Sequence, residues 1–222
     1  MHPYLLHVGH LYLPTFGVLA AVGLMLALAL SQYTATRVGI DPDALWDAGL
    51  FAILAAFVLS RLLLIVENFQ NFLAYPILLL AVPSLTTAGL LLTAIASGVW
   101  LHFKRIRMLA ALDAWAPCAT LVWFFLALGH YAEGSDPGLP VTRPVALYVA
   151  GVAMALTAVL VYLGRGRASV GLVVAGTAQF LLCFMRQPGV QGVAGLDALQ
   201  VVALGMVVAG CTLWLTAPSA SA

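Results

Sequence analysis

The sequence predicts an all-α integral membrane protein with seven transmembrane helices, and two observations lead to this fold class. First, 64% of the 222 residues are hydrophobic and only 8% are charged, with a mean hydropathy of +1.08. An ordinary soluble domain carries about a quarter charged residues, so this chain cannot cover a surface that faces water. Second, seven apolar stretches reach or approach the roughly 20 residues that a bilayer-spanning helix needs.

The seven predicted spans follow one another in a single bundle, which we interpret as one domain over residues 1–222. They cover residues 11–30, 45–66, 84–102, 108–131, 144–163, 169–185 and 199–215. The last two are short, so we expect the bilayer to thin beside them or the two helices to pack centrally. Residues 67–83 contain a further apolar patch at 72–82, marked by Pro76 and Pro83, which is too short to cross and predicts a re-entrant or interfacial arm.

Basic residues predict the orientation, because loops with an excess of Lys and Arg stay in the cytoplasm. One set of loops holds only Arg143 and Arg186. The other set holds six basic residues, namely Arg37, Lys104, Arg105, Arg107, Arg165 and Arg167. We therefore expect the N-terminus outside and the C-terminus in the cytoplasm.

Asp113 lies about one turn inside the fourth predicted span, close to its inner end. A carboxylate at that depth needs a partner. The nearby Lys104, Arg105 and Arg107 are predicted to supply it. Together with Arg165 and Arg167, these three residues are also expected to hold anionic lipid of the inner leaflet.

Most of the remaining unusual polar residues fall at the predicted outer face. Polar groups are costly inside a membrane, so this cluster predicts a site for a phospholipid headgroup, a peptide or a small solute. His130 and Glu133 have the spacing of an acid and base pair. A solvent-exposed loop after the end of a helix explains these two polar residues equally well. Taken singly, Arg61 fits a side chain that snorkels to the headgroups, and Arg143 and Arg186 fit helix-end anchors.

No metal or cofactor is expected, and the charge balance of nine basic and eight acidic residues excludes a nucleic-acid-binding face. His2, His7 and His10 are loosely spaced and have no Cys or carboxylate beside them, which argues against a metal site. The cysteines lie inside apolar runs without a metal-motif spacing, so we interpret them as small apolar filler. They are Cys118, Cys183 and Cys211.

The opening Met-His-Pro-Tyr-Leu-Leu-His-Val-Gly and the following Leu-Pro-Thr-Phe-Gly resemble the start of bacterial prolipoprotein diacylglyceryl transferases. So do Gly-Ile-Asp-Pro-Asp-Ala-Leu-Trp-Asp at 39–47, Asp-Ala-Trp-Ala-Pro at 113–117 and Phe-Met-Arg-Gln-Pro at 184–188. The resemblance covers nearly the whole chain. It implies seven spans, a short arm and a multi-pass location in the bacterial plasma (inner) membrane. It also implies transfer of a diacylglyceryl group from phosphatidylglycerol to the lipobox cysteine of a preprolipoprotein.

The chain departs from this family at its polar motifs. Relative to the family pattern, Thr86 replaces a histidine, His130 and Gln179 replace arginines, Glu133 replaces an asparagine, Cys183 replaces a glutamate and Phe16 replaces a tyrosine. Threonine cannot act as a base at neutral pH, and histidine lacks the permanent charge and planar fork of arginine. The order of the predicted spans thus matches the family, while many of the polar residues in the family motifs are replaced.

Two hypotheses follow from these departures. The first is a divergent transferase, with His130 as the candidate catalytic residue, either near the lipid phosphate or as the base, and with Arg61, Arg143 and Arg186 as the cations. The polar cleft would then be completed by Thr86, Glu133, Tyr148 and Gln179. The second is a non-catalytic relative that binds phospholipid or a lipoprotein's membrane segment. A small transporter has little support, because no charged residue lies at mid-membrane in paired broken helices.

Overall fold

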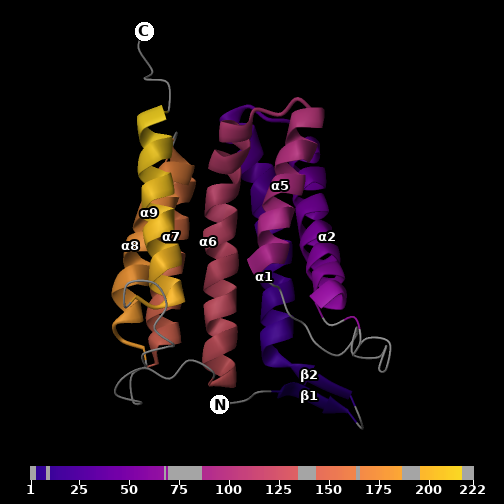
Figure 1. The fold of residues 1–222 in the computed structure, drawn as a ribbon, viewed down its shortest axis with the longest axis vertical. Coiled ribbons are helices and arrows are strands. Elements are labelled where there is room, and N and C mark those ends of the chain that lie inside the picture. The colour runs from indigo at the N-terminus through magenta and orange to yellow at the C-terminus, as the bar shows by residue number, and fades with distance from the viewer. Residues whose placement is uncertain are drawn as a thin grey trace.

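The computed structural model describes residues 4–8, 11–67, 69, 87–134, 144–163, 166–186 and 196–216. Within these ranges a pair of strands precedes seven helices (Figure 1). The strands are β1 (Tyr4–Val8) and β2 (Leu11–Pro14). The helices are α1 (Thr15–Val38), α2 (Pro42–Glu67), α5 (Thr87–Phe103), α6 (Met108–Glu133), α7 (Val145–Tyr162), α8 (Arg167–Cys183) and α9 (Ala198–Thr216). The predicted helical class is confirmed for the bundle, whereas the strands were not expected.

Five of these helices, α1, α2, α6, α7 and α9, are long and apolar enough to cross a membrane. The helices α5 and α8 are also apolar but have only 17 residues each. The sixth span was expected to be short, and α8 confirms this; the seventh was also expected to be short, but α9 has 19 residues and is long enough to cross. The predicted arm at 67–83 lies almost entirely outside the described residues, which include only its first residue, Glu67, at the end of α2.

The first predicted span, residues 11–30, is wrong at both ends. Residues 11–14 form β2, which pairs antiparallel with β1 so that Val8 lies opposite Leu11, and α1 begins only after Pro14. At the other end α1 continues to Val38, past the point where hydropathy falls. The polar residues of this extension are accommodated because their hydroxyls bond to backbone carbonyls: Ser31 donates to Leu28 at 2.7 Å, and Thr34 donates to Ala114 of α6 at 2.8 Å. Gly39, with φ of 72°, ends the helix in a left-handed cap.

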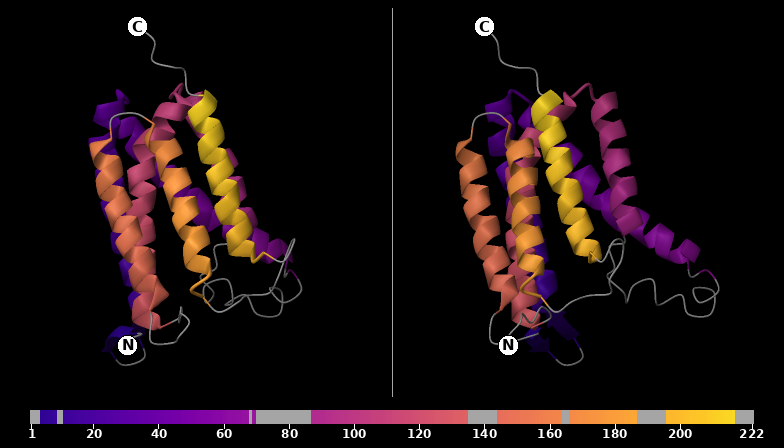
Figure 2. Two further views of the ribbon diagram at one scale, coloured as in Figure 1. Left: turned by 90° about the vertical axis from the view of Figure 1, so that its left-hand side faces the viewer. Right: turned by 60° about the vertical axis from the view of Figure 1, so that its left-hand side comes forward.

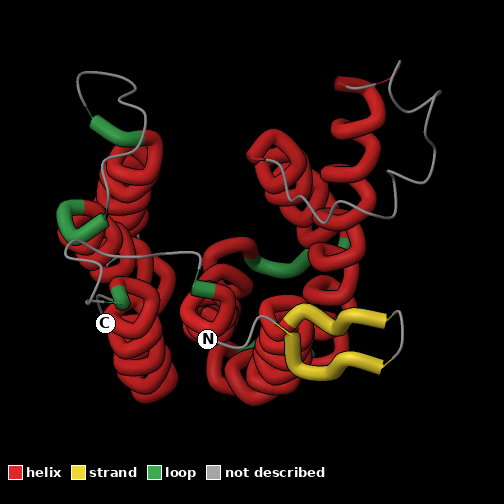
Figure 3. The backbone as a smooth tube through the Cα atoms, turned by 90° about the horizontal axis from the view of Figure 1, so that it is seen from below, coloured by secondary structure: helices red, strands yellow, loops and turns green. Residues whose placement is uncertain are grey.

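The helices form one bundle in which α6 contacts α1, α7 and α8. On one side α2 packs against α1 and α5, and on the other side α8 and α9 lie side by side (Figures 1 and 2). The end of the bundle that carries the strand pair is called the lower end here, and the end at which α9 finishes is called the upper end (Figure 1). Figure 3 views the bundle from the lower end and shows the strands at one side of the helices.

Glycines set the two tightest helix contacts, since small residues let helix backbones approach closely without a hydrophobic driving force. A Cβ atom on Gly23 or Gly129 of the α1–α6 interface would meet Phe125 or Phe16 at 2.7 Å and 2.6 Å. On the α8–α9 interface, a Cβ on Gly210 would lie 2.7 Å from Val173 Cγ2 and 2.9 Å from the carbonyl oxygen of Ser169. These contacts hold α9 against α8.

Replacing Gly210 with alanine is therefore expected to lower the free energy of unfolding by about 1–3 kcal/mol, because the added methyl overpacks the α8–α9 contact. Gly205 on the same helix provides the matched control, since a Cβ there meets nothing within 4 Å. Gly205→Ala should be neutral or stabilising by up to about 1 kcal/mol. Denaturant unfolding in mixed micelles measures both variants, and equal stabilities would contradict the close approach of the two helices.

Two predictions for the upper end are wrong. The Asp113 carboxylate accepts hydrogen bonds from the backbone N–H groups of Gly166, at 3.1 Å, and Ala168, at 2.8 Å. Its partners are thus the unpaired donors that open α8, while Lys104, Arg105 and Arg107 are exposed.

Arg167 was expected to hold lipid but is 0% exposed, so it cannot reach a headgroup. Its Nε donates to the Leu163 carbonyl at 2.6 Å. Arg165 lies outside the described residues.

Candidate functional site

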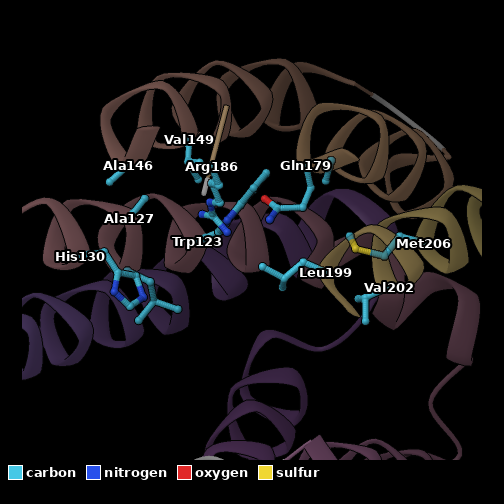
Figure 4. A pocket seen from close by; sticks show the side chains of 12 residues that line it. Trp123, Ala127, His130, Ala146, Val149, Gln179, Arg186, Leu199, Val202 and Met206 are labelled. Atoms are coloured by element: carbon cyan, nitrogen blue, oxygen red, sulfur yellow. The ribbon is translucent and has the colours of Figure 1, made fainter. Parts of the chain in front are cut away.

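A cavity of about 370 Å³ lies between α6, α7, α8 and α9 in the lower half of the bundle (Figure 4). Most of its wall is apolar, and three polar side chains contribute to it: His130, Gln179 and Arg186. The apolar part is built mainly from Trp123, Leu126, Ala127, Ala146, Val149, Ala175, Leu199, Val202 and Met206. An apolar cavity with a few convergent polar groups is the usual form of a small-molecule site.

Helix periodicity places Gln179 in this wall. Ala175 and Gln179 are four residues apart on α8 and therefore share the face that lines the cavity. Figure 4 shows the Gln179 and Arg186 side chains extending toward the same part of the cavity. The amide oxygen of Gln179 is buried and has no hydrogen-bond partner in the described part of the chain. This oxygen can accept a hydrogen bond from a ligand in the cavity.

Arg186 follows the end of α8, where the chain closes a short turn. The backbone N–H groups of Phe184, Met185 and Arg186 donate to the carbonyls of Leu181, Leu182 and Cys183. The turn therefore keeps Arg186 near the helix end and lets its side chain reach the cavity wall. Arginine is always charged and suits planar bidentate contact with phosphate or carboxylate.

His130 lies in the last turn of α6, which ends at Gly134 with φ of 70°. The ring of Phe16, at the start of α1, lies 4.9 Å from the His130 ring between centroids. Gly129 allows this approach, because a side chain there would collide with the same phenylalanine. The imidazole is exposed at the cavity edge, further along α6 than Trp123 (Figure 4).

The structure separates the predicted site residues into three groups. His130, Gln179 and Arg186 come together in the cavity wall. Three others do not line it: Arg61 is half-buried on α2, Tyr148 is 48% exposed on α7, and Glu133 is exposed at the end of α6. Thr86 and Arg143 lie outside the described residues. Cys183, which replaces the family glutamate, is also absent from the described lining.

Sequence reasoning missed the apolar wall that α9 supplies through Leu199, Val202 and Met206. Their spacing of three and four residues marks one helical face, but nothing in the sequence shows which neighbour that face meets. Trp123, in the middle of α6, was missed for the same reason. Among the described residues, no group of three His, Cys, Asp or Glu side chains is placed to hold a metal ion.

Comparison with known proteins identifies the family. A family profile described as prolipoprotein diacylglyceryl transferase matches residues 3–216. The chain belongs to the prolipoprotein diacylglyceryl transferase family. The resemblance seen in the sequence is thereby confirmed.

Curated relatives of this family member carry the name phosphatidylglycerol–prolipoprotein diacylglyceryl transferase. One from Trichormus variabilis is 23% identical over 150 residues, which cover 66% of this chain and 53% of the relative. One from Nostoc sp. matches with the same identity and coverage. The chain thus spans about half the length of the curated relatives that it matches.

Proposed function

We propose that this chain is a bacterial inner-membrane protein that binds a phosphatidylglycerol-type phospholipid in the α6–α9 cavity and transfers its diacylglyceryl group to a lipoprotein cysteine. The observation that carries the proposal is the cavity itself. It combines a cation, an amide and an imidazole with a mainly apolar wall, in a member of the transferase family. An amphipathic lipid needs this combination of polar and apolar contacts.

The proposed topology has seven crossings, with the lower end outside and the upper end in the cytoplasm. Successive helices reverse direction through the bundle, and the two chain ends lie at opposite ends of it (Figure 1). Exposed Arg37, Lys104, Arg105 and Arg107 gather at the upper end, as the positive-inside rule requires of a cytoplasmic face. This orientation opens the cavity toward the outer leaflet.

Each polar residue of the cavity has a role in the proposed reaction. Arg186 neutralises the lipid phosphate, and the buried amide oxygen of Gln179 accepts a hydrogen bond from a headgroup hydroxyl. The cysteine sulfur attacks the carbon of the diacylglyceryl unit that is bonded to a phosphate oxygen. A C–S bond forms, the C–O bond breaks, and glycerol phosphate leaves. His130 takes the thiol proton as the general base.

A non-catalytic lipid-binding protein is the second candidate, and the composition of the cavity favours it. Within the described lining, Arg186 is the one permanently charged side chain. Arg61 and Glu133 are not among the residues that line the cavity. A site with a single fixed cation can hold a phosphate while stabilising the leaving group less strongly.

Complementation separates the two candidates. The resident transferase of a bacterial host is depleted, this chain is expressed, and a reporter lipoprotein is analysed by mass spectrometry. The expected result is a mass increase of one diacylglyceryl group together with restored growth. An unmodified reporter, with this chain correctly inserted and phosphatidylglycerol co-purifying with it, would contradict transfer and support the non-catalytic candidate.

A further inference from the structure

The ring of Phe16 packs against the proposed base from a helix outside the cavity wall. Its centroid lies 4.9 Å from that of the His130 imidazole, and the two ring planes are tilted by 48°. His130 belongs to the described lining of the cavity, whereas Phe16 and the rest of α1 do not. Phe16 therefore contacts the imidazole without occupying the place of a ligand.

The backbone on both sides of this contact is held closely. Phe16 is the second residue of α1, which begins directly after Pro14 at the end of β2. On α6, Gly129 is buried, and a Cβ atom there would lie 2.6 Å from Phe16 Cδ2 and 3.3 Å from Phe16 Cα. The α1 backbone thus reaches the residue that directly precedes His130. Phenylalanine has no hydrogen-bonding group, so the ring itself is what it offers to the imidazole.

His130 benefits from such a contact because it is exposed in the last turn of α6. Exposed side chains change rotamer within picoseconds to nanoseconds. A general base must keep its nitrogen within hydrogen-bonding reach of the proton, and a misplacement of about 1 Å can cost about 10²-fold in rate. A ring packed beside the imidazole excludes the rotamers that would occupy the same space.

We propose that Phe16 is a positioning residue that holds the His130 imidazole toward the cavity, in the orientation in which it takes the thiol proton. This inference rests on the proposed function, since it takes His130 as the base. Phe16 itself touches neither the lipid nor the cysteine. Loss of its ring should therefore slow the chemical step and leave lipid binding unchanged.

Phe16→Leu keeps an apolar side chain and removes the ring. Transfer from phosphatidylglycerol to a lipobox peptide is measured with the purified protein in mixed micelles. The kcat should fall about tenfold, while KM for the lipid stays within about twofold of the wild type. Phe16→Tyr retains the ring and should retain most of the kcat. If Phe16→Leu is not recovered in folded form, Phe16→Met is measured in its place.

Phe125→Leu is the matched control for packing between the same two helices. Phe125 is half-buried like Phe16, and it packs against Gly23, about two turns further along α1. It is also absent from the described lining of the cavity. A purely structural effect should appear equally in Phe16→Leu and Phe125→Leu, whereas a positioning effect should appear in Phe16→Leu and leave the kcat of Phe125→Leu at the wild-type value.

NMR with isotope-labelled histidine measures the contact without activity. The ring current of Phe16 shifts the Cε1–H resonance of His130, which His130→Gln identifies by removing it. This resonance should move in Phe16→Leu and keep its position in Phe125→Leu and Phe16→Tyr. A resonance that does not move in Phe16→Leu overturns the positioning role.

The kinetic outcomes separate this inference from the proposed function. If the wild type transfers and His130→Ala does not, equal kcat values for Phe16→Leu and Phe125→Leu overturn the positioning role and leave the proposed function intact. Equal losses in Phe16→Leu and Phe16→Tyr also overturn it, because the ring is then not the feature that acts. A wild type that does not transfer overturns the proposed function, and the positioning role is overturned with it.

Discussion

Asp113→Ala is expected to lower the free energy of unfolding by about 2–4 kcal/mol, because it leaves two backbone N–H groups at the start of α8 without their acceptor, at about 1–2 kcal/mol each. The carboxylate accepts two backbone hydrogen bonds at the start of α8, and its negative charge attracts the fully buried Arg167. Without the carboxylate, the N–H groups of Gly166 and Ala168 lose their acceptor. The buried Arg167 guanidinium loses a nearby negative charge. Denaturant unfolding in mixed micelles, followed by helical circular dichroism, measures the change.

Three further variants make this test specific. Asp47→Ala removes an exposed carboxylate on α2 and should change stability by less than about 0.5 kcal/mol. Asp113→Asn keeps one acceptor oxygen and loses the charge, so its effect should be intermediate. The double variant Asp113→Ala with Arg167→Met should recover part of the loss, because the buried charge is then also removed. If Asp113→Ala were as stable as Asp47→Ala, the network would not hold the α6, α7 and α8 ends together.

His130→Ala should reduce diacylglyceryl transfer about 10²- to 10⁴-fold, the range over which a positioned general base accelerates a reaction. Binding of phosphatidylglycerol should change little, because Arg186 and Gln179 remain in the cavity wall. The two quantities are measured separately, as the mass shift of a reporter lipoprotein and as co-purified lipid. A loss of transfer without a loss of lipid identifies His130 as the base.

His102→Ala is the matched control, since His102 is an exposed histidine near the end of α5 at the upper end of the bundle. It should transfer at the wild-type rate. His130→Gln should lose transfer as His130→Ala does, because an amide keeps the polarity but cannot take a proton. Full transfer by either His130 variant would remove this residue from the mechanism, and equal losses of lipid and transfer would make it a binding residue instead.

The membrane class, the family and most helices were predictable, because these depend on short stretches of sequence. A bilayer requires each spanning segment to be apolar and to satisfy its own backbone hydrogen bonds, so each helix is marked locally. Hydropathy failed at α1 for an equally local reason. It cannot show that residues 11–14 pair with residues 4–8, or that the Ser31 hydroxyl bonds to its own helix.

The site was predictable only in part. The outer polar residues were recognised as a group, yet His130, Gln179 and Arg186 line the cavity while Tyr148 does not. Adjacent residues on a helix point about 100° apart, so Val149 faces the cavity and its neighbour Tyr148 faces away. The rotation of α7 about its own axis makes this difference, and packing against α6 and α8 sets that rotation.

By itself the sequence determined that this chain is a helical membrane protein of the diacylglyceryl transferase family, with its polar residues exchanged at the family's motif positions. The tertiary structure decided which of those residues meet. It also gave Asp113 backbone N–H partners at the start of α8 in place of the expected basic side chains, and it buried Arg167, which was expected to face lipid. Composition and periodicity report the environment of one helix at a time. Contacts between α6, α8 and α9 depend on which helices become neighbours and on the faces that they present to each other.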